Sequence, residues 1–453
     1  MTTVDTRTVE HAAALTDRIA DRLRSVDYAR WRARVEQVGG CLQPIHLTGE
    51  FEVNHAATGE RLARRAGTVF VPCGNRREAV CPTCSDRYAA DAFHLIRAGL
   101  SGGKGVPESV ASKPRLFLTL TAPSFGPVHT RRVRPSTGEV VRCRCGQRHH
   151  GDDPRVGTAL DPDTYDYTGA VLWQAHAGQL WNRFTVRLRR ELARAAGIRV
   201  SYAKVGEYQR RGLIHFHAIV RIDGPAGPAD PAPSWAHPDL IENAIRTAAA
   251  ATVVRRTLPT TEGVEQPYRF TWGAQIDTRT IAPADTVALE NEQGTITDAA
   301  LAGYIAKYAT KGTTASETAD RPFRSEADID AITTTAHHRL MMCTAWDLGD
   351  LPALGYLRRW AHMLGFRGHF LTKSKHYSTR FGELRTVRRH WQHQQLLDRL
   401  GVTDDEITVV NHWNHAGTGY DTDAERALAS AIYQRQREQR KLQHAQEAPP
   451  WNS

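Results

Sequence analysis

Residues 212–223 read GLIHFHAIVRID, and no other stretch of the chain decides as much about its fold. Apolar residues recur at every second position, as in a β-strand with one buried face, because successive side chains of a strand point to opposite sides. The predicted core face carries Ile214, Phe216, Ala218, Val220 and Ile222. The opposite face carries His215 and His217, which places two imidazoles next to each other.

The preceding residues predict a partner strand for this one. Residues 198–207 form a second strand-like run, and a turn near residues 209–212 folds the chain back as a β-hairpin. The hairpin brings Glu207 beside His215. Two histidines and a carboxylate leave positions open for water and phosphate oxygens, which suits Mg²⁺ or Mn²⁺, and the imidazoles shift the preference toward Mn²⁺. An HxH strand alone is also compatible with ordinary surface histidines or with a barrel metallohydrolase.

Residues 302–312, AGYIAKYATKG, predict a helix that gathers reactive groups on one face. Tyr304, Lys307, Tyr308 and Lys311 follow at i, i+3, i+4 and i+7. Ammonium groups beside a phenol favour the phenolate and can hold a phosphate, although an amphipathic surface helix would show the same pattern. Together with the hairpin, the helix supplies what phosphodiester transesterification needs: a nucleophile, and a cation that stabilises the developing charge.

The remaining pattern predicts an α+β protein. Helices are expected at 8–37, 85–99, 170–196, 239–251 and 297–311, and further strands at 116–121 and near 268–276. The chain beyond residue 312 reads as helices that end in a charged tail at 424–446.

Composition shifts suggest three regions. Residues 125–165 are rich in Gly, Pro, Arg and Asp and look like an insertion, and residues 224–238 hold five prolines, as in a linker or an ordered loop. We predict an N-terminal helix with a metal-held module (1–100), a hairpin domain with the insertion (112–315), and a helical basic region with a tail (316–453).

Seven cysteines in this chain indicate metal binding more than disulfides, because we expect the protein to be cytoplasmic. The N-terminus has no apolar signal-peptide segment, and no stretch approaches the ~20 apolar residues of a membrane span. Cys81-Pro-Thr-Cys84 forms a knuckle that, with Cys41 and Cys73, predicts a closed structural zinc site. A weaker second pattern, a possible second zinc site, consists of Cys143, Cys145, His149 and His150.

The positive charge of the chain is concentrated in one block. The net charge is +10, and residues 355–401 hold ten Lys or Arg and two acids. Such a block suits nucleic acid, although a solvated basic helix would look the same. The candidate DNA-binding residues are Arg358, Arg359, Arg367, Lys373, Lys375 and Arg380. Interleaved aromatic residues that could stack on bases are Trp360, Phe366, Phe370 and Tyr377. The chain has no G-x-x-x-x-G-K-[ST] pattern, which argues against an ATP-driven helicase.

Three segments resemble, in order, the motifs of the rolling-circle initiators called HUH endonucleases: LFLTLTAP (116–123), GEYQRRGLIHFHAIV (206–220) and YIAKYATK (304–311). The last resembles the two-tyrosine helix of initiators from isometric single-stranded DNA phages. The spacing from Glu207 to His215 resembles that of the metal-binding carboxylate in viral initiators. Over most of residues 41–385 the chain is similar to RepSA-like initiators of actinobacterial plasmids and integrative conjugative elements. That similarity is carried by CGNRREAVCPTC (73–84), HLIRAGLSGGKGVPESV (94–110), AKVGEYQRRGLIHFHAIVRIDG (203–224) and RRWAHMLGFRGHFLTKSKHYST (358–379).

The resemblance implies an HUH core, which is a central antiparallel sheet flanked by helices. It also implies that this core nicks one strand at a double-strand origin. It implies a 5′-phosphotyrosine link, later rejoining of the strand, contacts with single-stranded and duplex origin DNA, and a host helicase and polymerase as partners. The Y-x-x-K pattern implies Tyr304 as the first nucleophile and Tyr308 as its partner. Relatives often carry further cysteines before the segment TYDY (164–167), where this chain has LDPD (160–163). Two alternatives stay open: a non-enzymatic zinc-containing origin-binding protein, and a metallohydrolase of small substrates.

Overall fold

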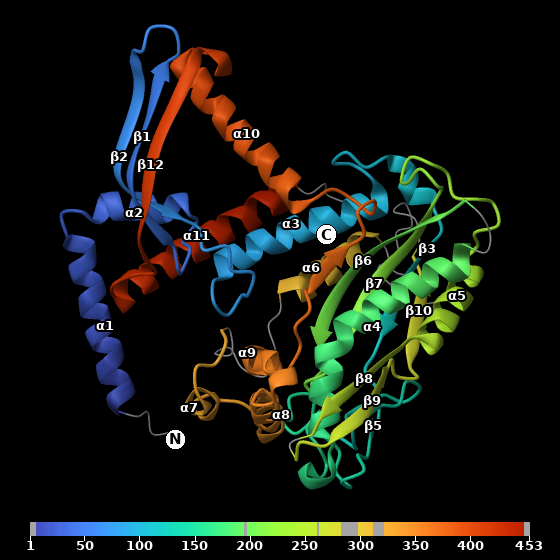
Figure 1. Ribbon diagram of the computed structural model, residues 1–453. Coiled ribbons are helices and arrows are strands. Elements are labelled where there is room, and N and C mark those ends of the chain that lie inside the picture. Colours follow the sequence, from blue (N-terminus) through green and yellow to red (C-terminus); the bar gives the residue numbers. More distant parts are fainter. Residues whose placement is uncertain (1–5, 194–196, 261, 282–297, 311–320, 448–453) are drawn as a thin grey trace. The chain divides into compact units, whose positions relative to one another are not determined.

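The computed structural model describes residues 6–193, 197–260, 262–281, 298–310 and 321–447, and the chain divides into two compact units (Figure 1). One unit comprises residues 90–381, and the other joins residues 1–89 to residues 382–453. The units do not coincide with the three predicted regions. The predicted region 316–453 is split at Gly382, because residues 371–373 add a strand to the sheet of the larger unit while the later residues fold with the N-terminal segment.

The larger unit is built on a sheet in the order β10-β3-β7-β6-β11, in which every neighbouring pair is antiparallel. Its strands are β3 (Arg115–Leu120), β6 (Arg199–Tyr208), β7 (Ile214–Asp223), β10 (Ile276–Thr280) and β11 (Leu371–Lys373). Separate two-stranded ribbons are formed by β4 (Arg132–Val133) with β5 (Val140–Val141) and by β8 (Val253–Pro259) with β9 (Glu265–Thr271). The predicted hairpin and the predicted α+β class are therefore confirmed.

One face of this sheet is the main hydrophobic core. The five residues assigned to the core face of the HxH strand are all buried there, each at most 1% exposed. They pack with residues of the helices α4 (Tyr167–Ala193), α5 (Pro238–Ala251), α8 (Ala336–Leu348) and α9 (Tyr356–Trp360). The short helix α7 (Glu326–Asp330) packs on α8.

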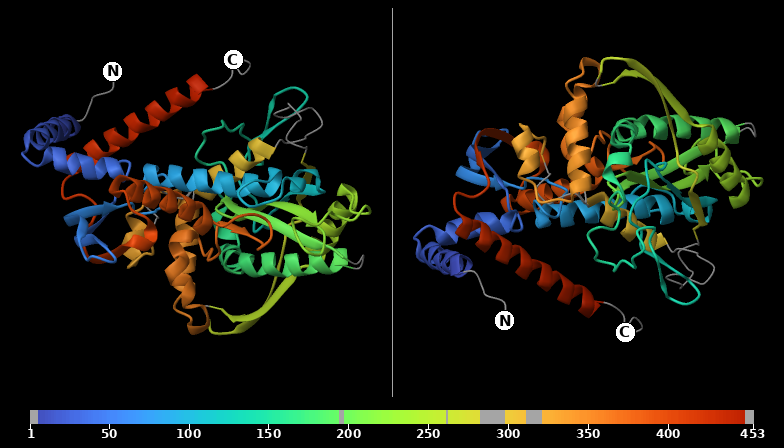
Figure 2. Two further views of the ribbon diagram at one scale, coloured as in Figure 1. Left: turned by 90° about the horizontal axis from the view of Figure 1, so that it is seen from above. Right: turned by 90° about the horizontal axis from the view of Figure 1, so that it is seen from below.

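The opposite face of the sheet carries the histidines and is also covered. The helix α6 (Asp298–Thr310) lies against β6. At the other end, the guanidinium groups of Arg115 and Arg221 donate to carbonyls at the C-terminal end of α3 (Pro82–Ser101). Seen edge-on in Figure 2, the sheet lies between α4 on one side and this end of α3 on the other. The histidines therefore lie in a covered layer of the protein.

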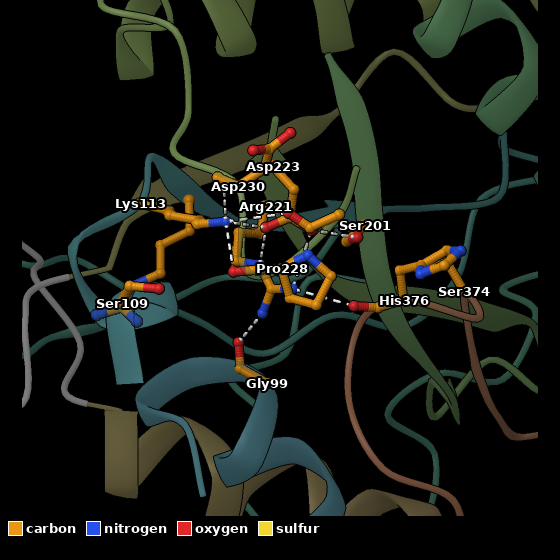
Figure 3. A network of polar contacts seen from close by, with 12 residues as sticks. Gly99, Ser109, Lys113, Ser201, Arg221, Asp223, Pro228, Asp230, Ser374 and His376 are labelled. Atoms are coloured by element: carbon orange, nitrogen blue, oxygen red, sulfur yellow. Dashed lines mark hydrogen bonds and ion pairs between the residues drawn. The ribbon is translucent and has the colours of Figure 1, made fainter. Parts of the chain in front are cut away.

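A buried ionic network closes the end of the hairpin far from its turn (Figure 3). Asp223 accepts hydrogen bonds from Arg221 at 2.8 and 3.0 Å, from Ser201 at 2.6 Å and from Lys113 at 3.1 Å. The Lys113 ammonium also donates to the carbonyls of Gly227, Pro228 and Asp230. Burial raises the pKa of Asp223, but the guanidinium, hydroxyl and ammonium donors outweigh it and hold the pKa below its usual value of 3.8. The carboxylate therefore stabilises the fold above about pH 4 and loses that contribution as the pH falls through the lowered pKa.

Replacing Asp223 by alanine is expected to lower the free energy of unfolding by about 3–5 kcal/mol, because it leaves two buried cations without their anion. Denaturant unfolding measures this effect. The matched control is Glu242→Ala, at an exposed ion pair with Arg246, where a loss of about 1 kcal/mol or less is expected. Equal losses in the two variants would contradict a structural role for the network.

The smaller unit corrects two expectations. The helix predicted at 8–37 is two helices, α1 (Thr6–Arg24) and α2 (Tyr28–Gln37), separated by residues 25–27. The predicted metal-held module contains two strands that the sequence pattern did not specifically predict, β1 (Ile45–His55) and β2 (Arg61–Val71). The C-terminal region, expected to be all helical, supplies β12 (Ile407–Thr418) between α10 (Phe381–Leu400) and α11 (Asp423–Glu447). These strands form one antiparallel sheet in the order β12-β1-β2.

Helix α11 holds the two ends of the chain together in this unit. Arg18 and Arg22 of α1 form ion pairs with Asp423 and Glu425, while Ala429 and Ile432 pack on α2. Gly40, which follows α2, has φ +73°, and a Cβ there would lie 2.6 Å from the carbonyl oxygen of Ala429. Only glycine permits both that conformation and that approach. Among the helices of the described residues, none combines the length and the apolar composition that spanning a bilayer requires.

Candidate active site

Glu207, His215 and His217 come together near the turn of the β6–β7 hairpin. Glu207 and His215 are direct partners across the two strands, and His217 lies on the same face of β7. The carboxylate Oε2 of Glu207 lies 3.2 Å from Nε2 of His215 and 3.3 Å from Nε2 of His217. One ligand atom from each residue therefore faces a common point, and the three lie within 4.8 Å of one another. The structure thus brings together all three residues that the sequence predicted as metal ligands.

Neighbours on β3 fix the orientation of the His217 ring. Thr119 is the cross-strand partner of His217, and its hydroxyl lies 2.9 Å from Nδ1. Phe117 stacks on the imidazole, with 5.5 Å between ring centroids and 12° between the planes. Burial lowers the pKa of His217, and His215 adds to the lowering, although the hydrogen bond with Glu207 opposes it. The neutral ring, held at Nδ1 by the threonine, offers Nε2 as a lone-pair donor.

Helix α6 places a tyrosine hydroxyl at the same point. The Tyr304 hydroxyl lies 3.1 Å from Nε2 of His217, and its ring packs edge-on against the rings of His217 and Phe117. Lys307, one turn further along α6, is exposed. The side chain of Tyr308 and the whole of Lys311 lie outside the described residues.

The hairpin turn that carries these groups is tied to the body of the domain. The buried Gln174 of α4 donates to the Gly212 carbonyl and accepts from the Ile214 amide. Arg211 donates to the carbonyls of Ala122 and Pro123, just beyond β3. Gly212 has φ +74°, and a Cβ there would lie 2.7 Å from Sδ of Met341, so this position requires glycine.

The sequence reasoning did not single out Thr119 and Phe117 as site residues. Both belong to the strand predicted at 116–121, on the side opposite Leu116, Leu118 and Leu120. The alternation of that strand was the available signal, because its non-leucine face has to lie next to the histidine face of β7.

In the smaller unit, Cys41, Cys73, Cys81 and Cys84 form a cluster that is consistent with a structural zinc site. Their sulfurs lie within 4.8 Å of one another. The sulfurs of Cys81 and Cys84 are each 3.7 Å from that of Cys41, close to the separation of about 3.8 Å expected for thiolates on a tetrahedral zinc. The amides of Leu42 and Cys73 donate to two of these sulfurs, which favours thiolates.

The variant Cys81→Ser is expected to lose one zinc per chain and to unfold the smaller unit, because structural zinc contributes directly to folding. Elemental analysis and thermal unfolding measure the two effects. The half-buried Cys343, which belongs to no cysteine cluster among the described residues, provides the control Cys343→Ser. Full zinc content in Cys81→Ser would contradict this assignment.

The predicted second cysteine and histidine cluster is wrong in one ligand. Cys143, Cys145 and His149 come together as predicted, but the fourth member is His129, while His150 is exposed. Sequence spacing favoured His150 because it follows His149 directly. His129 reaches the cluster because the β4–β5 ribbon folds the chain back beside it.

The basic block is divided between the two units, and several of its members make structural contacts. Arg358 pairs with Asp350 and lies over the Trp346 ring. Arg367 donates to the Ala175 carbonyl and lies over the Tyr356 ring. Lys373 donates to three carbonyls of residues 374–378. Among the six candidate DNA-binding residues, the exposed ones are Arg359, Arg367, Lys375 and Arg380.

The expectation that aromatic residues of this block stack on bases is wrong for three of the four. Phe366, Phe370 and Tyr377 are at most 5% exposed and pack inside the larger unit. Trp360 is half-buried.

The variant Lys375→Ala is expected to weaken DNA binding and to reduce the slope of log K against log salt by about 0.7–0.9, the value of one phosphate contact. Stability should not change, since the side chain is exposed. Lys373→Ala is the contrasting variant, because removing a lysine that holds three carbonyls should lower the melting temperature. A salt slope for Lys375→Ala equal to that of the wild type would count against a phosphate contact.

Two histidines and a glutamate on an antiparallel sheet, with a helix-borne tyrosine hydroxyl among them, define an α+β protein with a candidate metal and nucleophile site. Sequence comparison identifies the family. The family model RepSA, described as "Replication initiator protein, pSAM2", matches residues 27–434. The chain is also 44% identical over 427 residues to a replication initiator protein of Streptomyces ambofaciens, with 90% of each protein covered. The chain therefore belongs to the RepSA replication initiator family, which confirms the resemblance. No solved structure matches it.

Proposed function

We propose that this protein is a replication initiator that nicks one DNA strand at its origin by tyrosine transesterification, on an HUH-type core, and later rejoins the strand. The observation that carries the proposal is the Tyr304 hydroxyl, 3.1 Å from Nε2 of His217 and beside a carboxylate–dihistidine cluster. Membership of a replication initiator family makes origin DNA the expected substrate.

The donor set fits a divalent cation. Adjacent ligands of an octahedral ion with bonds of about 2.1 Å are about 3.0 Å apart, and the Glu207 carboxylate lies 3.2 and 3.3 Å from the two imidazole nitrogens. Glu207, His215 and His217 would hold Mg²⁺ or Mn²⁺ on one side and leave the other side open. When bound, the cation would neutralise charge that develops on the scissile phosphate.

The residues of the chain provide the nucleophile and its alignment. Tyr304 attacks the phosphorus atom as its phenol loses a proton. The bond from phosphorus to the 3′ oxygen breaks, and that oxygen takes up a proton. The products are a 5′-phosphotyrosine and a free 3′-hydroxyl, which can later attack the same phosphorus and reseal the strand. Packing of the Tyr304 ring on His217 and Phe117 holds the hydroxyl near the phosphate site and reduces the entropic cost of reaching it.

Other residues extend the proposal. Lys307 and Lys311 would steady the phosphate or the phenolate, and Tyr308 would act as the second nucleophile when a round of replication ends. The exposed cations of the basic block would contact the single-stranded and duplex forms of the origin, with a host helicase and polymerase acting downstream. The four-cysteine cluster would hold a structural zinc, separate from the chemistry.

The test uses single-stranded origin oligonucleotides labelled at either end. After incubation with Mn²⁺ or Mg²⁺ and denaturation, the 3′-labelled fragment is expected to migrate with the protein. The 5′-labelled fragment should be released with a free 3′-hydroxyl. Binding without any adduct in either metal would favour the alternative of a non-enzymatic zinc-containing origin-binding protein. An adduct that carries the 5′-labelled fragment would contradict the proposed polarity.

A further inference from the structure

We propose that residues 125–165 bind a second structural zinc through His129, Cys143, Cys145 and His149, and that this zinc holds the segment against the turn of the β6–β7 hairpin. Between residues 124 and 156 the only buried residues are Cys143 and His149. Regular structure there amounts to β4 and β5, two residues each. A segment of this length without an apolar core requires another source of stability, and metal ligation is a common one.

The four ligand atoms have the separations of a tetrahedral zinc site. Nε2 of His149 lies 3.2 Å from Nδ1 of His129 and 3.3 Å from Sγ of Cys145. Bonds of about 2.0–2.1 Å to nitrogen and 2.3 Å to sulfur place tetrahedral ligands about 3.3–3.6 Å apart. All four atoms lie within 4.8 Å of one another. Two thiolates and two imidazoles are a common ligand set for structural zinc.

A carboxylate orients His149 as such a site requires. Nδ1 of His149 donates to Oδ2 of Asp153 at 2.7 Å, so Nε2 is left with its lone pair toward the cluster. Arg155 donates to both oxygens of Asp153 and fixes the carboxylate in turn. The sulfur of Cys143 accepts the Thr130 amide, which favours the thiolate. A histidine that served only for packing would not need Asp153 and Arg155 to fix its ring orientation.

The cluster is connected to the hairpin turn through His129. The His129 amide donates to the Thr158 carbonyl, and the Gly157 amide donates to the His129 carbonyl, at 2.9 and 2.8 Å. Gly157 packs so closely on Arg210, in the turn, that a Cβ there would lie 2.5 Å from the Arg210 backbone. The Arg210 guanidinium donates to the Gly151 carbonyl. Fixing His129 on zinc therefore holds the segment that packs on residues 209–212.

Zinc content of the full-length protein tests the site. After dialysis against a chelator, the wild type is expected to retain two zinc ions per chain, one in each cluster. The matched pair is His129→Ala, expected to retain one, and His150→Ala, expected to retain two because His150 is exposed outside the cluster. His129→Cys keeps a ligand at this position and is expected to retain two. One zinc in the wild type, or two in His129→Ala, would overturn the site.

Hydrogen exchange tests the link to the turn without relying on nicking. Amides of residues 209–212 are expected to exchange about tenfold faster in His129→Ala than in the wild type, because local opening becomes easier. His150→Ala and His129→Cys should exchange like the wild type. Unchanged exchange in a His129→Ala protein that has lost one zinc would show that the metal does not support the turn.

Discussion

Tyr304→Phe is expected to eliminate the covalent protein–DNA adduct and to lower the nicking rate by about a thousandfold or more. Removing the nucleophile of an enzyme typically lowers its rate by at least this factor. The reason is that Tyr304 supplies the hydroxyl at the carboxylate–dihistidine cluster, 3.1 Å from His217. Phenylalanine keeps the ring that packs on His217 and Phe117, so stability and DNA binding should stay near those of the wild type.

Tyr308→Phe is the matched control, since it removes the same group one helical turn away. If Tyr308 is a second nucleophile, Tyr308→Phe should leave the first adduct intact and reduce later strand transfer. If Tyr304 is the only nucleophile, Tyr308→Phe should change neither the adduct nor strand transfer. Proteolysis and mass spectrometry of the wild-type adduct identify the modified tyrosine directly. An undiminished adduct in Tyr304→Phe would refute the assignment, and an adduct in the double variant would remove α6 from the chemistry.

The parts of the site that depend on local periodicity could be predicted from the sequence. Alternation along residues 212–223 fixes which side chains share a face, and the short turn fixes the register that brings Glu207 beside His215. The helix over residues 304–310 likewise depends only on neighbouring residues. The contact between the Tyr304 hydroxyl and His217 depends on how α6 packs on the sheet, and only the structure shows it.

The missed features depend on contacts between residues far apart in the chain. Strand β12 pairs with β1, which lies more than 350 residues earlier, and no local sequence pattern identifies β1 as its partner. His129 lies 14 residues before Cys143, whereas His150 is adjacent to a true cluster member, so spacing favoured the wrong histidine. Lys373 looks like a DNA contact by charge, yet its ammonium is occupied by backbone carbonyls.

Replacing His217 by alanine is expected to lower nicking by about a thousandfold or more while leaving duplex binding largely intact. The imidazole contributes one of three candidate metal ligands, and Mn²⁺ binding measured by titration should weaken in parallel with the rate. His217 is buried, so the alanine variant also loses packing against Phe117 and the contact with Thr119. Part of any loss could then come from a distorted sheet.

Two further variants separate these effects. Thr119→Val removes the partner of Nδ1 but keeps the ligand nitrogen, so metal affinity and rate should fall only about 10- to 100-fold, as for other residues that orient a metal ligand. His215→Ala removes the neighbouring ligand without touching Thr119 or Phe117, and should match His217→Ala in rate. If metal binding is the cause, both histidine variants lose Mn²⁺ affinity and nicking together, whatever their melting temperatures. Normal nicking by either histidine variant, with its metal affinity unchanged, would leave the hairpin with a structural role only.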